Sequence, residues 1–185
     1  MINGRILGFT ILIILVFSIS TPFLYAGNSP KLNNGKKWRI AYYEGGPYSE
    51  YTDTMRTLVM GLIELGWITE TNPPDYHEEM PMPYMKWMQK NESPYLLIKS
   101  EDCYSANWDN QLRAKLRKQL LTKLKTGEID MVIAMGTWAG IDLANNEHAV
   151  PVMVLSTSDP VRAGIIKSAD DSGFDHVTAR VDPKR

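Results

Sequence analysis

The chain has 185 residues, 44% hydrophobic and 22% charged, which is ordinary for a globular protein and enough for one domain plus a targeting segment. A formal net charge of −1 argues against a nucleic-acid-binding protein, which normally carries a clear positive excess. Cys103 is the only cysteine, so an internal disulfide is excluded. No His with an Asn or Asp stands at a recognisable spacing from it, and we expect a thiol without a special role.

The first 26 residues have the layout of a secretory signal. Arg5 is followed by an apolar core at residues 6–17, then by small or polar residues that lead to Ala26. This predicts a signal peptide over residues 1–26, cleaved after Ala26, and a periplasmic or other extracytoplasmic location. The alternative is an uncleaved membrane anchor over residues 6–26, which is just long enough to span but is weakened by its serines, Thr21 and Pro22.

A polar leader, a strand and a helix follow. Residues 27–37 are expected to be a flexible leader and residues 38–43 the first strand, after which residues 44–47 form a turn rich in glycine. A helix is predicted over residues 49–65, ended by Gly66. Its apolar face carries Tyr51, Met55, Leu58, Val59 and Leu62 at helical spacing.

Residues 69–93 combine prolines with methionine and tryptophan. The prolines exclude one long helix, although a short one is possible over residues 83–90. Such a cluster can be an adaptable binding surface. We favour the alternative, an insertion folded down onto the edge of the sheet.

The next strand is predicted at residues 95–99, and residues 105–109 connect it to the clearest helix, residues 110–125. Asp109 or Asn107 would cap this helix, whose leucines repeat every four residues. Basic residues occupy its other side. A basic face can meet anionic lipid or nucleic acid, but it is more often simply solvated, as the net charge favours here.

Residues 131–135 form an apolar run typical of a parallel strand buried on both faces. Thr137 is a good N-cap, so a helix should start at Trp138 and end near residues 145–146. A strand at residues 150–155 completes a right-handed β-α-β unit. One or two helical turns at residues 161–167 and a last strand at residues 176–181 are expected after it. The fold class is therefore α/β, a doubly wound parallel sheet of order 2-1-3-4-5.

Three loops should come together where the strands of such a sheet end, because open α/β sheets bind ligands at that edge. They supply hydroxyls, free N–H groups at a helix start, a carboxylate and aromatic rings, which suit a small polar ligand with an apolar part held without reaction. Asp159 also has a simpler interpretation as a plain turn residue that caps a helix. The candidate ligand-binding residues are Glu44, Gly45, Tyr48, Gly136, Thr137, Trp138, Ser156, Ser158 and Asp159.

The sequence offers little for catalysis. The three histidines are scattered, and none has a second His or Cys at metal-ligand spacing. A nucleophile elbow, a phosphate-binding Gly-Lys-Ser/Thr motif and a dinucleotide fingerprint are all missing. We therefore expect no enzyme, no metal and no cofactor.

Three segments together resemble the substrate-binding proteins of ABC transporters of the tryptophan/tyrosine type. They are residues 130–139 with Gly136-Thr137, residues 150–154 with Val-Pro-Val, and residues 158–164, Ser-Asp-Pro-Val-Arg-Ala-Gly. The resemblance covers residues 38–181 and implies the first, N-terminal lobe of a periplasmic-binding-protein type I fold. It also implies that Gly136 and Thr137 lie at the ligand's carboxylate and that Ser158 and Asp159 line the cleft floor.

The same resemblance implies a protein of two lobes with an amino-acid-like solute between them and a membrane permease as partner. Residues 182–185 would begin the crossover to the second lobe. Glu44, which stands where many members have a small hydroxyl residue, could hold an ammonium group, and Tyr43, Tyr48 or Trp138 could stack on an apolar part. The alternative is the extracellular sensor of a membrane signalling receptor. An exported hydrolase would need a nucleophile and base that the sequence does not show.

Overall fold

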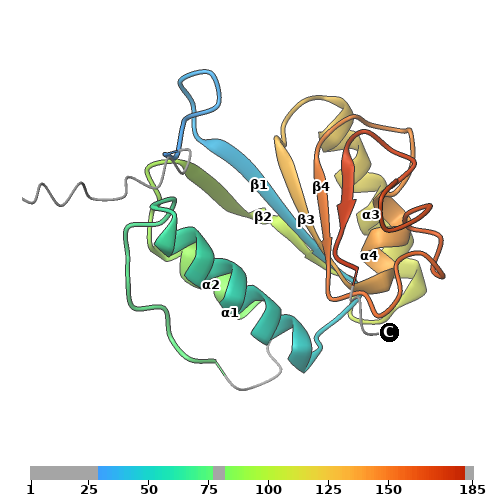
Figure 1. Ribbon diagram of the computed structural model, residues 1–185, viewed down its shortest axis with the longest axis horizontal. Coiled ribbons are helices and arrows are strands. Elements are labelled where there is room, and N and C mark those ends of the chain that lie inside the picture. Colours follow the sequence, from blue (N-terminus) through green and yellow to red (C-terminus); the bar gives the residue numbers. More distant parts are fainter. Residues whose placement is uncertain (1–28, 77–81, 182–185) are drawn as a thin grey trace, which may run out of the picture.

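The computed structural model describes residues 29–76 and 82–181 as a five-stranded parallel sheet flanked by helices (Figure 1). The strand order β2-β1-β3-β4-β5 confirms the predicted doubly wound sheet. The signal-peptide and crossover predictions lie outside the described residues. The elements are β1 Trp38–Glu44, α1 Ser49–Glu64, α2 Pro83–Lys90, β2 Leu96–Ser105, α3 Asn110–Lys125, β3 Met131–Met135, α4 Gly136–Leu143, β4 Val152–Leu155 and β5 Val177–Ala179.

Helices cover both faces of the sheet, so the strands are buried on two sides. Side chains alternate along β1: Tyr42 packs into the apolar cluster under α1 and α2, and Tyr43 into the cluster under α3 and α4. The same alternation places Ile133 with the first cluster and Ala134 with the second. Long apolar runs in β1 and β3 follow from this arrangement.

The helix predictions are confirmed for three of the four helices. Asp109 caps α3, since its carboxylate accepts a hydrogen bond from the Leu112 N–H at 2.7 Å. Gly66, with a φ of +77°, lies just beyond the end of α1 as expected, and Gly127, with a φ of +68°, lies just beyond the end of α3. The prediction for α4 was wrong at its start: the helix begins at Gly136 with Met135 at the N-cap position, and no side chain caps it.

The prediction for β2 was also wrong, because the strand continues to Ser105. Its pairing with β1 shifts between Ile40, opposite Ile98, and Tyr42, opposite Cys103. The three extra residues form an irregularity of the β-bulge type. Polar residues there interrupt the apolar pattern and hide the second half of the strand. β4 and β5 are shorter than expected, and residues 161–167 contain a turn rather than a regular helix.

The described part of the insertion folds onto the protein. Tyr84, Met85, Trp87 and Met88 of α2 are buried, in the cluster shared with α1 and the sheet. This favours the packing interpretation of the methionines over an exposed binding surface. Residues 77–81 lie outside the described residues. Within the described ranges, no helix is both long and apolar enough to cross a bilayer.

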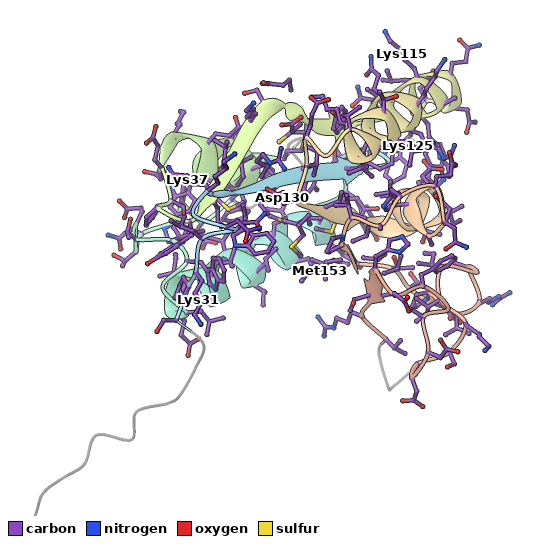
Figure 2. All side chains as sticks on the ribbon, turned by 90° about the horizontal axis from the view of Figure 1, so that it is seen from above. Lys31, Lys37, Lys115, Lys125, Asp130 and Met153 are labelled. Carbon is purple, nitrogen blue, oxygen red and sulfur yellow. The ribbon has the colours of Figure 1, made fainter. Side chains whose placement is uncertain are left out.

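The basic side of α3 is largely compensated by acidic groups. Arg113 pairs with Asp142, and Lys123 with Asp102. Arg117 and Lys125 both reach Glu147. Lys115 points away from the sheet (Figure 2). Most of these charges therefore belong to local ion pairs.

Candidate functional site

Four strands end together at one edge of the sheet, which we call the carboxyl edge. Glu44, the last residue of β1, pairs with Ser105 of β2 on one side and with Met135 of β3 on the other. Met135 in turn pairs with Leu155, the last residue of β4. The loops that follow therefore leave the sheet side by side, at the lower end of the strands in Figure 1.

All nine predicted residues lie at this edge or in its loops, but they differ in exposure. Tyr48, Ser158 and Asp159 are exposed, whereas Thr137, Trp138 and Ser156 are half-buried. Gly45 and Gly136 are buried backbone positions. The register thus brings the three predicted loops together.

Glu44 is not a turn residue, as expected from the sequence, but the last residue of β1, with only 1% of its surface exposed. The Tyr42 hydroxyl donates to its Oε2 at 2.7 Å, while Oε1 is buried without a hydrogen-bond partner. Burial raises the pKa of the carboxyl, and the Tyr42 and Ser105 hydroxyls partly offset that increase. A ligand group that reached Oε1 would find an unsatisfied acceptor.

Gly136 turns the chain from β3 into α4, and no other residue fits its place. Its φ is +81°, and a Cβ at this position would collide with the Tyr51 hydroxyl. Tyr51 itself packs edge-on against Tyr48, with ring centroids 5.3 Å apart. The close approach of α1 to the α4 start therefore depends on a glycine at residue 136.

Trp138 packs against a polar network formed by Arg113, Asp142 and Tyr43. The Arg113 guanidinium lies 4.5 Å from the centre of the Trp138 ring and binds both oxygens of Asp142, at 2.8 and 2.9 Å. The Tyr43 hydroxyl donates to the same carboxylate at 2.6 Å. Tyr43 is fully buried, so the suggestion that it stacks on a ligand was wrong.

The loop after β2 also reaches the carboxyl edge, and sequence reasoning treated it only as a connection. Trp108 in this loop is 47% exposed, and its indole packs against Gly45 and Gly46. Its ring lies edge-on to Trp138, with centroids 5.6 Å apart. The signal was available: every loop that follows a parallel strand reaches the same edge.

The loop after β4 contributes polar groups. Ser156 has a left-handed φ of +53°, and the Thr157 hydroxyl is buried without a hydrogen-bond partner. Asp159 is exposed, and its Oδ1 accepts from the Arg162 N–H at 2.9 Å. That contact caps a turn, so Asp159 has the structural role offered as its simpler interpretation.

The arrangement combines aromatic rings, hydroxyls, a buried carboxylate and a helix start, and is suited to binding. Within residues 29–76 and 82–181, no group of three or more His, Cys, Asp or Glu side chains is placed to hold a metal ion. The free thiol of Cys103 is half-buried, and burial raises its pKa to about 12, which keeps it protonated.

No protein-family model and no curated protein sequence matches this chain. Solved structures do match. An ABC domain in complex with L-Trp from Streptococcus pneumonia is 19% identical, with a TM-score of 0.52, over 78% of this chain and 38% of that one. A conserved domain protein from Vibrio cholerae is 17% identical, with a TM-score of 0.48 over 78% and 38%. The ligand-free, open form of a substrate-binding protein with adhesive properties from Clostridium difficile is also 17% identical, with a TM-score of 0.48 over 77% and 38%.

The chain thus spans well under half the length of the structures that it matches. At this identity the likeness concerns the fold alone. The fold of the described residues is similar to one part of an ABC domain from Streptococcus pneumonia, whose structure was solved in complex with L-Trp.

Proposed function

We propose that this chain provides a ligand-binding lobe of an exported solute-binding protein for an ABC-type uptake system. The observation that carries the proposal is the register of the sheet, which brings the ends of β1, β2, β3 and β4 to one edge. Ligands of open α/β sheets bind at such an edge. The fold shared with an L-Trp-bound ABC domain supports the same conclusion.

The ligand in this proposal is small, organic and amino-acid-like. Thr137 and the N–H groups at the start of α4 receive its carboxylate, because the first turn of a helix has N–H groups without intrahelical acceptors and a favourable dipole. Glu44 receives the ammonium group at its unpaired Oε1, once a movement of the side chain exposes that buried oxygen. Tyr48 and Trp138 contact the apolar part. Gly45, Gly136, Ser156, Ser158 and Asp159 shape the surrounding loops.

A second lobe closes over the ligand in this scheme, and a membrane permease accepts it. The signal peptide predicted over residues 1–26 would place the protein outside the cytoplasm.

Binding can be tested by nuclear magnetic resonance with the exported chain and L-tryptophan, L-tyrosine and L-glutamate as probes. We expect saturable shifts of the Thr137 and Trp138 amide signals with at least one probe. Thr137→Val should weaken that binding about threefold to tenfold, because a hydrogen bond to a charged group is lost. Thr122→Val, on the solvent side of α3, is the matched control and should leave it unchanged. Absence of any shift at the carboxyl edge with all probes would contradict solute binding.

A further inference from the structure

A cavity of about 230 Å³ lies between the sheet and α1, away from the loops of the carboxyl edge. Its lining includes Ile40 and Ile133, which are buried in the middle of β1 and β3. Trp38, Met131 and Met153 also line it, at or near the starts of their strands, and these side chains are only half-buried. The cavity therefore opens toward the end of the sheet opposite the carboxyl edge.

The walls of this cavity are entirely apolar. Trp38 contributes its ring but not its polar atom, because its Nε1–H donates to the Lys31 carbonyl at 2.9 Å. An ordered water molecule needs two to four polar partners, which these walls do not supply. The volume exceeds the roughly 150 Å³ of an apolar cavity that binds benzene. The cavity therefore suits a short hydrocarbon chain better than water or a polar solute.

The leader, described from residue 29 to residue 37, crosses the opening of the cavity. The Lys31 carbonyl is bound to the Trp38 indole, which forms one wall. Pro30 lies beside Gly66, where an added Cβ would be 3.8 Å from the proline ring. Gly66 directly precedes Trp67, which forms another wall. The leader thus contacts the region of both tryptophans.

The same leader carries positive charge that has no acidic partner. Within the described ranges, Lys31, Lys36 and Lys37 form no ion pair. Two hydrogen bonds between Asn33 and Lys36, at 2.7 and 2.9 Å, close the turn that separates Lys31 from the other two lysines. In Figure 2, Lys31 lies on the α1 side of this end of the molecule and Lys37 lies beside the start of β1. Cationic side chains therefore stand next to an apolar opening.

We propose that this cavity is a second binding site, which takes the alkyl chain of a small anionic amphiphile such as a medium-chain carboxylate. The chain is removed from water among the apolar side chains, and the carboxylate remains at the opening beside Lys31 and Lys37. The charge of the leader favours an anion over a neutral hydrocarbon and disfavours an ammonium group. This site is separate from the one proposed at the carboxyl edge, and each can exist without the other.

The test follows methionine methyl signals by nuclear magnetic resonance in the full exported chain, with octanoate as the probe. We expect octanoate to shift the Met131 and Met153 signals saturably. The signal of Met60, which is exposed on α1 and does not line the cavity, should not move. The Thr137 amide at the carboxyl edge should not move either.

Three further probes separate the chain from the charged group. Hexanoate should bind about tenfold to twentyfold more weakly than octanoate, because two fewer CH₂ groups are buried. 1-Octanol and octylamine have the same chain length as octanoate but lack its negative charge. Both should bind more weakly than octanoate, and octylamine should bind the most weakly of the three.

A double substitution tests the charge of the leader. Lys31→Glu combined with Lys37→Glu should weaken octanoate binding about threefold to tenfold and leave 1-octanol binding unchanged, because only the carboxylate meets the lysines. Lys115→Glu combined with Lys118→Glu changes the net charge equally on the exposed side of α3. This control should leave octanoate binding nearly unchanged.

A single substitution tests the cavity itself. Met153→Trp places a larger side chain in the wall and should abolish the shift of the Met131 signal with both octanoate and 1-octanol. Leu65→Trp introduces the same residue at a position that is 59% exposed and does not line the cavity. It should leave the binding of both probes unchanged.

Three outcomes would overturn the proposal, and none of them bears on solute binding read at Thr137. If octanoate shifts neither Met131 nor Met153, the cavity does not bind the alkyl chain. If 1-octanol binds as tightly as octanoate and the double substitution at Lys31 and Lys37 has no effect, the assignment of an anionic ligand is wrong. If dilution of the protein alone shifts the Met131 and Met153 signals, a second copy of the chain covers the cavity instead.

Discussion

The two ends of the sheet are built on different principles. At the carboxyl edge, Glu44 and Thr157 each carry a buried oxygen without a hydrogen-bond partner. Three of the five non-glycine residues with left-handed φ among the described residues, Asn107, Trp108 and Ser156, also lie there. Each of these features costs stability.

The opposite end, which we call the amino edge, is more fully satisfied. Asp130, labelled in Figure 2, accepts hydrogen bonds from the backbone N–H of Arg39 at 2.8 Å and from its guanidinium at 2.6 and 2.9 Å. The cavity of about 230 Å³ lies between the sheet and α1. Its walls are entirely apolar and include Trp38, Leu62, Trp67, Leu96, Met131 and Met153.

His148 is an exception to this pattern at the amino edge. His148 is buried with an unpaired Nδ1, and its ring packs edge-on against His176 at a centroid distance of 4.7 Å. Burial lowers the pKa of His148, and the neighbouring His176 lowers it further. The neutral imidazole is therefore favoured, so the exception carries no buried charge.

The contrast indicates that the features that lower stability lie mainly at the carboxyl edge, where the loops meet. A sequence that satisfies most local rules at one end and breaks several at the other is typical of a fold that carries its binding site at one edge. If this is correct, substitutions at the amino edge should change stability without changing solute binding at the carboxyl edge. Some substitutions at the carboxyl edge should have the opposite effect.

The largest effect is expected at Gly136. Gly136→Ala must place a Cβ at a φ of +81° and against the Tyr51 hydroxyl, and should cost about 3 kcal/mol or more in the free energy of unfolding. Gly164→Ala is the matched control, since its φ is +71° but nothing lies within 4 Å of the added Cβ. It should cost only about 1–2 kcal/mol. Urea denaturation measures the free energy of unfolding of both variants. Equal losses in the two variants would show that contact with Tyr51 does not constrain the carboxyl edge.

A smaller loss is expected at the amino edge from Asp130→Ala. Removing this carboxylate leaves the Arg39 guanidinium without its partner and should cost about 2 kcal/mol. Arg39 holds the pKa of Asp130 below its ordinary value, so the stabilisation is present above that ordinary value and is lost as the pH falls through the lowered one. The difference in the free energy of unfolding between the wild type and the variant should therefore decrease at acidic pH.

Asp171→Ala provides the comparison for Asp130→Ala, because it breaks an exposed ion pair with Lys167. It should change the urea midpoint far less. L-tryptophan affinity, measured in parallel, should be unchanged in both variants. Weaker binding by the Asp130 variant would mean that the two edges are coupled and that their separation is wrong.

The sequence predicted those parts of the fold that local patterns specify. Periodic apolar residues located α1 and α3, and Asp109 and Gly66 located the start of α3 and the end of α1. The strand order was predicted from the alternation of strands and helices. The bulge in β2 could not be predicted from the sequence. Polar residues end the local apolar pattern there, but pairing with β1 continues the strand beyond them.

The site was predicted as a set of loops but not as a set of contacts. Loop positions follow from topology, so the proximity of Gly45, Thr137 and Ser158 could be anticipated. The burial of Glu44 depends on how Tyr42 and α1 pack around it. The contact of Trp108 with Gly46 joins residues 62 positions apart, which no local pattern records.

The smallest predicted effect tests whether Glu44 lowers stability at the carboxyl edge. Because burial raises its pKa in the folded protein, the folded state holds this proton more tightly than the unfolded chain does. The contribution of Glu44 is therefore most favourable in acid, and it declines as the pH rises through the raised pKa. Glu44→Gln removes the charge and keeps the shape, so it should raise the Tm by about 2–4 °C at pH 8 and leave it nearly unchanged at pH 4.

Thermal unfolding between pH 4 and pH 8 measures this difference between the Glu44 variant and the wild type. Exposed Glu64→Gln changes the net charge equally and should show little pH-dependent difference. A lower Tm of Glu44→Gln at pH 8 would mean that the carboxylate is stabilising as it stands. In that case the unpaired Oε1 would not lower stability, and it would not support a ligand-binding role for Glu44. The contrast between the two edges would then depend only on the strained loops.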